Sequence, residues 1–411
     1  MRILAIETSC DETSMALVDM GINAQNELNM TIHSHFTASQ AQYHAQFGGV
    51  FPAMAKLEHI KACVPLLHTT FMESKISIPE NEWAQINLDT NKTENINKIL
   101  HREIDIANGL NEFCKNQKFP KIDLICVTNG PGLEPALYVG INFARALSEI
   151  MNIPVVGINH MLGHLYSSIL PTDTMHTNIK LNDLPDHAIA LLVSGGHTEL
   201  IELKGQNSKG KSIEYKLLGA TVDDAVGEAY DKVARLMGLS YPGGPLVAKL
   251  AEEARKNMSS DISKPIFPRP MLHSKNYDFS YSGLKTAVMY YLRDLLSRQA
   301  GNPISENEKL SLALAFEESA IEVLVKKTNR AMEEFAIDTL LVGGGVSANN
   351  YLRTELQKIA EKNNFTVHFP LQSLTGDNAL MIAIACGIEY LNKEIINEKD
   401  SIVANGMLSV A

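Results

Sequence analysis

Short apolar runs alternate with longer amphipathic segments along the 411 residues of this chain. The short runs, among them ILAIE, LICVTN and TLLVGGG, have the length and composition of buried strands. The longer segments, such as GINFARALSEIM and LSLALAFEESAIEVLV, place apolar residues at the spacing of a helix. This alternation predicts an α/β fold.

One arrangement of apolar and polar positions occurs twice. Residues 3–19, ILAIETSCDETSMALVD, and residues 188–203, AIALLVSGGHTELIEL, each consist of an apolar strand, a short polar turn and a second strand. A length of 411 residues also exceeds what one hydrophobic core usually organises. We therefore expect two lobes, each opened by a β-hairpin.

Residues 76–118 differ in character from the segments on either side. Eight asparagines lie between positions 81 and 120, and the only tryptophan of the chain is Trp83. We interpret this segment as a surface insertion outside the core. Its apolar residues recur at spacings that predict one amphipathic helix on the surface: Ile96, Ile99, Leu100, Ile106, Leu110 and Phe113.

Composition narrows the functional classes. The formal net charge of −11 disfavours a protein that coats nucleic acid without specificity, although a local basic patch can still bind RNA. The five cysteines are scattered and form no C-x-x-C pair, which argues against a disulfide framework and a zinc ribbon. No apolar run approaches about 18 residues, and the chain starts with a strand-like MRILAIETS. We expect a cytoplasmic protein without a membrane segment.

Three turns carry groups that suit a ligand site. The turn from Glu7 to Thr13 holds carboxylates and hydroxyls, which suit a phosphate, a metal-bound water or an acyl-transfer centre, and equally a polar hairpin with local hydrogen bonds. The glycines of Ser194–Thr198 and of GGGVSANNYLR, residues 343–353, let backbone N–H groups approach an anion. Neither matches the G-x-G-x-x-G spacing, so we favour a nucleotide held between lobes over a dinucleotide fold.

An acidic segment lies between these turns. Residues 221–245 predict a helix that ends at Gly238, and solvated acids are the usual explanation for its carboxylates. One of them, Asp231, lies ahead of a YPGGP turn at residues 241–245, whose bare backbone suits ribose hydroxyls. The acids of the segment are Asp223, Asp224, Glu228 and Asp231.

Two histidines in INHMLGHLY are candidate metal ligands. His160 and His164 are four residues apart, so on a helix they project from one face and can chelate one ion. Met161 occupies the place of the glutamate in H-E-x-x-H, which removes the general base of a protease. The best third ligand is Asp377, and two histidines with one aspartate suit iron or zinc. The alternative is a pair of ordinary helix histidines.

A basic and aromatic stretch is a candidate RNA contact. Residues 267–285 interleave Arg269, Lys275 and other cations with aromatic residues, as expected where phosphates and an unstacked base are held. The alternative is an aromatic hairpin packed into the second lobe. The stretch includes His273, Tyr277, Phe279, Tyr281 and Lys285.

Taken together and in order, ten motifs resemble the TsaD/Gcp family, which makes N6-threonylcarbamoyladenosine in tRNA and was once labelled O-sialoglycoprotein endopeptidase. The resemblance covers nearly all of the chain except residues 76–118 and 170–185, and its SGGHT motif is typical of the bacterial or organellar branch. The motifs are IETSCDET, HAQFGGVFP, NGPGL, NHMLGH, LLVSGGHT, DDAVGEAYDKVARLMGL with YPGGP, FPRPM, DFSYSGLKT, GGGVSANNYLR and TGDNALMIA.

The resemblance implies an actin-like and sugar-kinase-like fold of two lobes, with duplicated ribonuclease-H-like sheets and the active site between the lobes. We place the N-terminal lobe at residues 1–157 and 378–411 and the C-terminal lobe at residues 158–377. The implied metal ligands, for Fe²⁺ or alternatively Zn²⁺, are His160, His164 and Asp377. The implied positions for an adenylate or ATP are Leu192, Val193, Ser194, Gly195, Gly196, Asp231, Gly244 and Asn349. The catalytic candidates are Asp11, Glu12 and His197.

The implied reaction moves a threonylcarbamoyl group from threonylcarbamoyl-AMP to the N6 amine of the adenosine 3′ to the anticodon, position 37, in tRNAs that read codons beginning with A. The implied partners are tRNA, an inactive paralogous subunit (TsaB-like) and a small ATPase (TsaE-like). Two positions depart from the family pattern: Ala53 stands where relatives usually have glutamate, and Leu57 stands where they have a basic residue. This departure puts in doubt any role of that pair in binding tRNA or a partner.

Three other functional classes compete with this interpretation. A metalloprotease would need a carboxylate in the place of Met161. A small-molecule kinase of the same fold would need Mg²⁺, which histidine ligands suit poorly. A non-catalytic ATP switch would have no use for two histidines and Asp377.

Overall fold

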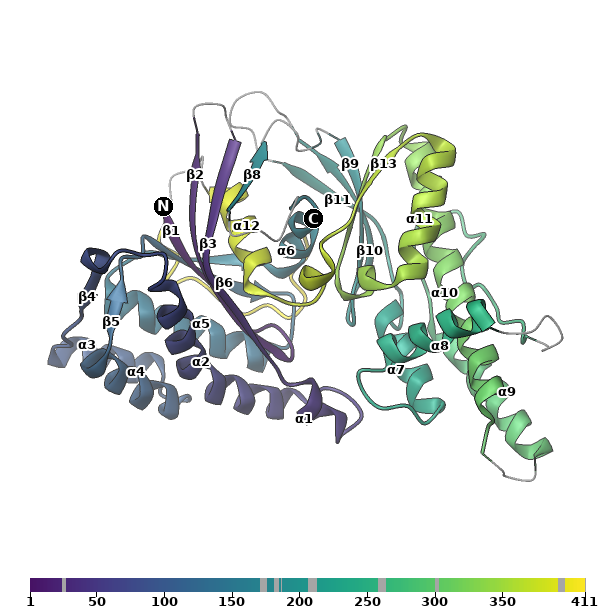
Figure 1. Ribbon diagram of the computed structural model, residues 1–411, viewed down its shortest axis with the longest axis horizontal. Coiled ribbons are helices and arrows are strands. Elements are labelled where there is room, and N and C mark those ends of the chain that lie inside the picture. The colour runs from purple at the N-terminus through teal and green to yellow at the C-terminus, as the bar shows by residue number, and fades with distance from the viewer. Residues whose placement is uncertain are drawn as a thin grey trace. The chain divides into compact units, whose positions relative to one another are not determined.

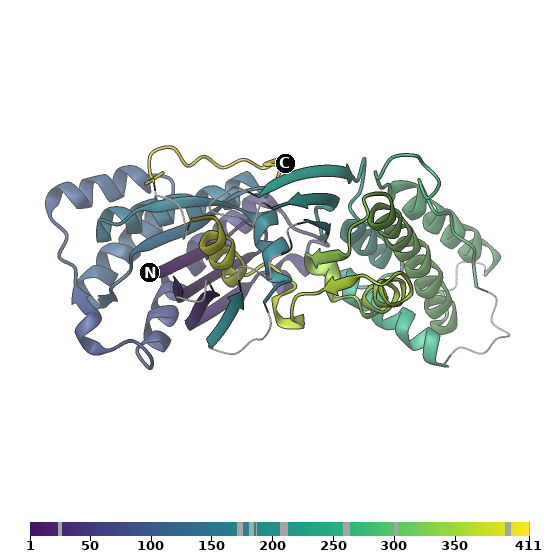
Figure 2. The same ribbon diagram turned by 90° about the horizontal axis from the view of Figure 1, so that it is seen from above.

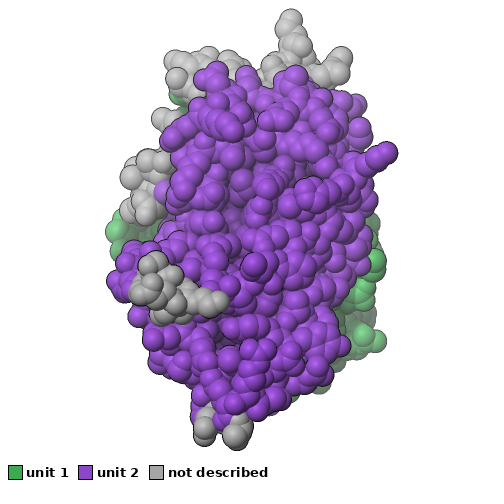
Figure 3. Space-filling view, turned by 90° about the vertical axis from the view of Figure 1, so that its right-hand side faces the viewer, with its two compact units in different colours: residues 1–40, 50–184, 376–410 green, residues 41–49, 185–375, 411 purple. Residues whose placement is uncertain are grey.

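The computed structural model describes residues 1–23, 27–170, 176–180, 185, 187–205, 213–257, 264–299, 303–390 and 396–410. The chain forms two compact units, the first from residues 1–40, 50–184 and 376–410 and the second from residues 41–49 and 185–375. Figure 3 shows the surface of the second unit in purple. Among the described helices, none combines the length and the apolar character needed to cross a membrane.

A six-stranded sheet forms the centre of the first unit, in the order β7-β6-β1-β2-β3-β8 (Figure 1). β1 and β2 form the predicted antiparallel hairpin, in which Arg2 lies opposite Asp19, and β3 continues it antiparallel to β2. β6 lies parallel to β1, and β7 lies parallel to β6. The strands are β1 (Arg2–Glu7), β2 (Glu12–Ile22), β3 (Glu27–Ser39), β6 (Leu124–Gly130), β7 (Val155–Asn159) and β8 (His176–Lys180).

Helices cover both faces of this sheet (Figures 1 and 2). Leu4, Ile6 and Met15 alternate with the residues of the opposite face and pack in one apolar core with α2 and α5. α12 lies against β1, β2 and β6, and because its residues Ala379 to Gly387 are all buried, its sequence is apolar on every side. The helices are α2 (Pro52–Ser74), α5 (Glu134–Met151), α6 (His160–Ser167) and α12 (Ala379–Tyr390).

The segment 76–118 is part of the first unit's core, so the prediction of a single surface helix is wrong. It contains two helices, and the first is capped by Asp89, whose side chain accepts a hydrogen bond from the N–H of Lys92. Trp83 and Phe71 pack edge to face, with ring centroids 6.2 Å apart. The apolar residues face this core instead of solvent, since Ile96, Leu100, Ile106, Leu110 and Phe113 are all buried in it. The elements are η1 (Glu80–Glu82), β4 (Trp83–Gln85), α3 (Thr90–Ile99) and α4 (Ile104–Asn116), with β5 (Lys118–Pro120) pairing to β4.

The second unit is built on a five-stranded sheet in the order β11-β10-β9-β12-β13. One face of the sheet carries Ile189, Leu191 and Val193, which share an apolar core with helices α7 to α11. The strands are β9 (His187–Val193), β10 (Thr198–Lys204), β11 (Glu214–Ala220), β12 (Thr339–Gly343) and β13 (Thr366–His368). The helices are α1 (Ala41–Ala45), α7 (Val226–Leu236), α8 (Gly243–Asn257), α9 (Ser282–Arg298), α10 (Glu306–Glu334) and α11 (Asn350–Asn363), with η3 (Gly345–Ala348) and η4 (Gln372–Leu374).

The two sheets have the same topology over five strands. β9, β10 and β11 are antiparallel neighbours, as are β1, β2 and β3. β12 lies parallel to β9 and β13 lies parallel to β12, as β6 and β7 do beside β1. The expected α/β fold with duplicated ribonuclease-H-like sheets is therefore confirmed.

The boundaries of the units differ from the expected lobes. We placed residues 158–377 in one lobe, whereas residues 158–184 and 376–377 group with the first unit and residues 41–49 group with the second. The reason is local: β7 passes directly into α6, α6 packs on α12, and β8 pairs with β3. All three candidate metal ligands consequently belong to the first unit.

Candidate functional site

The two histidines and the aspartate of the predicted metal site converge. Nε2 of His164 lies 3.0 Å from Oδ1 of Asp377, and Nε2 of His160 lies 3.4 Å from the same oxygen. Each of the three residues offers one potential ligand atom, and these atoms all lie within 4.8 Å of one another. Both histidines are buried, and Asp377 is largely so.

Helix caps place these ligands. Asn159, the last residue of β7, accepts hydrogen bonds at Oδ1 from the N–H groups of Met161 and Leu162, so that α6 begins at His160. His164 follows one turn later, and the two rings lie edge to face with centroids 4.6 Å apart. At the other end of the chain, Asn378 caps α12 through the N–H of Met381 and places Asp377 directly before the helix.

Sequence reasoning missed a second carboxylate at this cluster. Oε2 of Glu7, at the end of β1, lies 3.0 Å from Nδ1 of His160, and the side chain of Glu7 is fully buried. The signal was present, because Glu7 directly follows the apolar residues Ile3 to Ile6 of β1, and a buried acid needs a partner.

The charges of the cluster fit a divalent cation. Burial opposes the charged form of His160, but the charges of Asp377 and Glu7 outweigh it and raise the pKa of His160 well above its usual value. Burial also opposes the charged form of Asp377, yet the charge of His160 holds the pKa of Asp377 well below its usual value. The cluster thus demands positive charge, which a metal ion can supply. Two imidazoles and one carboxylate are a donor set for Fe²⁺ or Zn²⁺ that leaves coordination positions open.

The acidic turn between β1 and β2 lies in the same unit as this cluster. Ser14, just after the turn, accepts a hydrogen bond at Oγ from the N–H of Ala379, two residues after Asp377, over 2.9 Å. Asp11 is buried, and burial together with the charges of Asp11 and Asp377 raises the pKa of Glu12 well above its usual value. The fold therefore brings Asp11 and Glu12 near the metal ligands. The third catalytic candidate, His197, lies in the second unit, where its backbone N–H donates to Ser194 Oγ over 3.0 Å.

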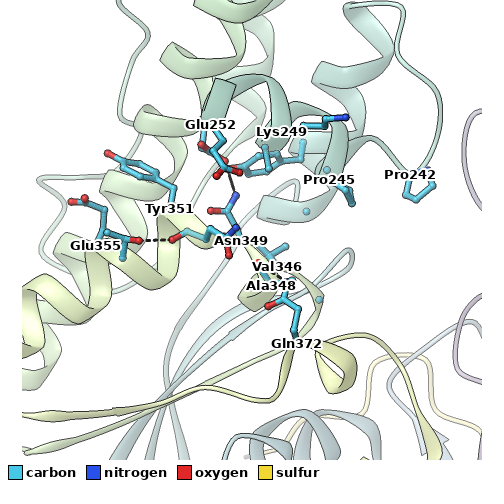
Figure 4. Close-up of a pocket in the computed structure, with 18 of the residues that line it drawn as sticks. Pro242, Pro245, Lys249, Glu252, Val346, Ala348, Asn349, Tyr351, Glu355 and Gln372 are labelled. Atoms are coloured by element: carbon cyan, nitrogen blue, oxygen red, sulfur yellow. Dashed lines mark hydrogen bonds between the residues drawn. The ribbon is translucent and has the colours of Figure 1, made fainter. Parts of the chain in front are cut away.

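A cavity of about 720 Å³ opens in the second unit, a size that suits a nucleotide (Figure 4). Four of the predicted binding residues line it: Gly195, Asp231, Gly244 and Asn349. Leu192, Val193, Ser194 and Gly196 do not line it. The first two are fully buried in β9.

The glycine turns shape one part of this cavity. Oδ1 of Asp231 accepts hydrogen bonds from the N–H groups of Gly243 and Gly244 over 2.7 and 3.1 Å, and so it holds the start of α8. Gly344 adopts φ +89°, and a Cβ there would lie 2.4 Å from the carbonyl oxygen of Val193, so only glycine fits. The turn after β12 can therefore lie directly against β9.

Glu317 is a second residue that sequence reasoning missed. It is fully buried in α10 and lines the cavity. Oε1 accepts hydrogen bonds from Asn349 Nδ2 over 2.6 Å and from the hydroxyl of Tyr230 over 3.3 Å, and Oε2 pairs with Arg255. The guanidinium of Arg255 in turn lies 3.6 Å from the ring centroid of Tyr351. The available signal was a glutamate that directly follows the apolar run LALAF.

The proposed RNA stretch is largely core. Phe279 and Tyr281 are fully buried and Tyr277 is 8% exposed, and all three belong to the apolar core of the second unit. Asp223 anchors the stretch by accepting hydrogen bonds from Tyr281 N and Ser282 N. The prediction that an RNA base stacks on these rings is therefore wrong. The alternative is confirmed in that the aromatic residues pack into the second unit, but the stretch is not a hairpin, since its described strand pairing is the isolated bridge between Phe279 and Thr221.

Comparisons with known proteins agree on one family. A family model described as "TsaD: tRNA N6-adenosine threonylcarbamoyltransferase" matches residues 31–82 and 105–384. A protein of Thermosipho africanus with the name tRNA N6-adenosine threonylcarbamoyltransferase is 37% identical over 398 residues, covering 97% of each chain. A protein of the same name from Chromobacterium violaceum is 38% identical over 386 residues, covering 94% of this chain and 92% of its own length.

One solved structure similar to this chain is full-length HypF in its phosphate- and nucleotide-bound form. The match has a TM-score of 0.45 and a sequence identity of 11%, and it covers 94% of this chain and 46% of the HypF chain.

Proposed function

The chain belongs to the TsaD family of tRNA N6-adenosine threonylcarbamoyltransferases, and we propose that it performs this transfer with a metal centre in its first unit and an adenylate pocket in its second. It is an enzyme that modifies tRNA by transferring a threonylcarbamoyl group. In the proposal the donor is threonylcarbamoyl-AMP and the acceptor is the N6 amine of adenosine 37 in tRNAs that read codons beginning with A.

The observation that carries the proposal is the convergence of His160, His164 and Asp377 in one buried cluster. These residues would hold one divalent ion, Fe²⁺ or alternatively Zn²⁺, which supplies Lewis-acid polarisation of the acyl carbonyl when bound. Neither competing enzyme class is favoured. Met161 is buried and offers no base for proteolysis, and the imidazoles suit the Mg²⁺ of a kinase poorly.

The chain's own residues supply the remaining chemistry. The N6 amine is a poor nucleophile because its lone pair is delocalised into the adenine ring, so its proton must be accepted as the new bond forms. Asp11 and Glu12 provide carboxylates for this proton beside the metal ligands. The amine attacks the acyl carbon, the bond to the phosphate oxygen breaks, and AMP leaves. We assign His197 to catalysis with these two residues.

The cavity of the second unit is the proposed site for the adenylate. Gly195 and Gly345 line it without a side chain, so that a phosphate can approach the backbone closely, and Asp231 and Asn349 offer fixed polar groups to a nucleoside. We keep Leu192 to Gly196 in the proposed site, with Leu192 and Val193 acting only through their backbone, since their side chains are buried in β9.

We further propose that the enzyme works in the cytoplasm with an inactive paralogous subunit and a small ATPase. The substrate tRNA supports the compartment. Ala53 and Leu57 leave the exposed start of α2 without the charged pair that relatives usually have there, so the contacts of that surface differ in this chain.

The experiment is a reconstitution. Purified protein, with candidate partner proteins added, is incubated with threonylcarbamoyl-AMP and unmodified tRNA, and digested tRNA is analysed by mass spectrometry for N6-threonylcarbamoyladenosine. Modified adenosine supports the proposal. Product formed equally by a His160→Ala variant would refute the role of the metal centre.

A further inference from the structure

Glu7 lies on the far side of the His160 ring from Asp377. Its Oε2 is 3.0 Å from Nδ1 of His160, while Asp377 faces Nε2 of the same ring. A carboxylate that accepts a hydrogen bond from an imidazole requires the proton to be on the nearer nitrogen. With the proton on Nδ1, Nε2 is the nitrogen that can bind a metal, and it faces Asp377, where the candidate metal ligands converge.

Other contacts hold Glu7 in place. Oε1 accepts a hydrogen bond from the N–H of Ser9 over 2.5 Å, and Oε2 accepts one from the hydroxyl of Thr128 over 2.5 Å. Ser9 Oγ also lies 3.2 Å from Nδ1 of His160. The carboxylate thus joins the first residues of the acidic turn to the histidine ring, and neither can shift without disturbing the other.

His164 provides the internal contrast. Its Nε2 faces Asp377, but its buried Nδ1 has no hydrogen-bond partner among the described residues. Among the described residues, therefore, His160 has a carboxylate at its Nδ1 and His164 does not. Metal-bound histidines usually have such a partner, which fixes the tautomer and makes the ligand more basic.

We propose that Glu7 is a positioning residue of the metal centre, which fixes His160 as the Nδ1-protonated tautomer and holds its ring toward Asp377. This inference rests on the proposed metal site. Glu7 is not itself a ligand, because the converging atoms come from His160, His164 and Asp377. Its charge also adds to that of Asp377, so the site attracts a dication more strongly than two histidines and one aspartate alone.

The test is zinc affinity, measured on the full chain by competition with a chromophoric chelator. Glu7→Ala should raise the Kd for Zn²⁺ by roughly 10- to 100-fold. Glu7→Gln keeps an acceptor oxygen but loses the charge, so its Kd for Zn²⁺ should lie between those of Glu7→Ala and wild type. If Glu7→Ala does not fold, the comparison of Glu7→Gln with wild type is the test. The matched control is Glu103→Gln. Glu103 is also a buried carboxylate of the first unit, but its side chain pairs with Lys56 over 3.2 Å and accepts a hydrogen bond from Asn142, and neither of these residues is a candidate metal ligand. Its Kd should not change.

A spectroscopic readout separates positioning from general stability. In ¹⁵N-histidine NMR of the zinc-loaded protein, His160 should show a protonated Nδ1 whose proton exchanges slowly, and Glu7→Ala should lose this slow exchange while Glu103→Gln keeps it. A folded Glu7→Ala variant with unchanged Kd and unchanged exchange overturns the role of Glu7 alone. Zinc binding by wild type that does not depend on His160 overturns the metal site as well.

Discussion

Asn349 donates a hydrogen bond from its side-chain nitrogen to Oε1 of Glu317 over 2.6 Å, while its side-chain oxygen accepts from the N–H of Leu352 at the start of α11. Both ends of this amide are thus fixed at the wall of the cavity. Glu317 is in turn held by Tyr230 and Arg255. The arrangement presents Asn349 to the cavity in one orientation only.

The first prediction concerns Glu317. Glu317→Ala removes the group that orients Asn349 and leaves the cation of Arg255 unpaired, so the Kd for AMP should rise about 10-fold or more, as for loss of a charge-assisted hydrogen bond. Glu317→Gln preserves an acceptor and should have a smaller effect. Isothermal titration calorimetry measures both. Glu318→Gln, next along α10 and paired with Lys264, is the control, and an equal effect there would assign the loss to stability of the helix.

A second prediction concerns the start of α8. Asp231→Ala leaves the N–H groups of Gly243 and Gly244 without their acceptor, so this turn should loosen and the Kd for AMP should rise by about 10-fold. Asp231→Asn keeps Oδ1 and should bind nearly as wild type. Circular dichroism checks that both variants are folded. Wild-type affinity in the folded Asp231→Ala variant would remove Asp231 from the site.

Lys327 gives a prediction about pH. It is 1% exposed in α10, and its ammonium donates to Ser274 Oγ over 2.8 Å and to the carbonyl oxygens of Asn276 and Asp278. Burial, with the charge of Arg330, lowers the pKa of Lys327 from 10.5 to about 8. The unfolded chain therefore binds more protons than the folded chain between these values, and the contribution of Lys327 to stability rises with pH across that window.

Denaturant unfolding of wild type and Lys327→Met measures this contribution. The variant loses the hydrogen bonds of Lys327 and should be less stable at pH 7 by about 1–3 kcal/mol. The difference in unfolding free energy between wild type and Lys327→Met should increase by about a further 1–3 kcal/mol as the pH rises from 7 to 10.5, which is the size that the pKa shift allows. A gap that narrows with pH would contradict the direction of the shift. Lys326→Met controls for loss of an exposed lysine from the same helix.

The segment 76–118 gives a fourth prediction. Leu110 is fully buried in the core of the first unit, so Leu110→Ala should lower the free energy of unfolding by about 2–5 kcal/mol. Ile104, in the same helix, is 63% exposed, so Ile104→Ala should change the free energy of unfolding by about 0.5 kcal/mol or less. Chemical denaturation compares the two. Equal and small effects would restore the view of this segment as a surface insertion.

The sequence predicted the two hairpins, β1 with β2 and β9 with β10, because each joins two mainly apolar strands through a short polar or glycine-rich turn. The duplicated sheets as a whole were implied by the resemblance to a family. The sequence also predicted that His160, His164 and Asp377 converge, since the helical spacing of the histidines and the resemblance to a family pointed to the same residues. The segment 76–118 was misjudged because its many asparagines suggested solvent, while only the packing showed that Ile96 and Leu110 face a core. The polar composition of an amphipathic helix indicates that one face is exposed to solvent, but it does not indicate which part of the protein packs on the apolar face.

Glu7 and Glu317 escaped prediction for a related reason. Each directly follows an apolar run, and its partner lies far away in the sequence, His160 for Glu7 and Asn349 for Glu317. The aromatic stretch 267–285 failed in the opposite way, since Phe279 and Tyr281 look suited to stack on a base but point into the core. Local pattern cannot separate these cases, because burial is set by the tertiary fold.

The central claim is that His160, His164 and Asp377 hold one metal ion on which threonylcarbamoyl transfer depends. The most direct measurement determines bound metal by mass spectrometry and transferase activity together, in anaerobically purified wild type and in His160→Ala, His164→Ala and Asp377→Ala. Wild type should carry about one Fe²⁺ or Zn²⁺ per chain, and each variant should lose the ion and the activity, with no further loss in double variants because one site is opened in each case. His101→Ala, at an exposed histidine of the first unit, should keep both. Full activity in the three metal-free variants, or full metal occupancy in Asp377→Ala, would contradict the account.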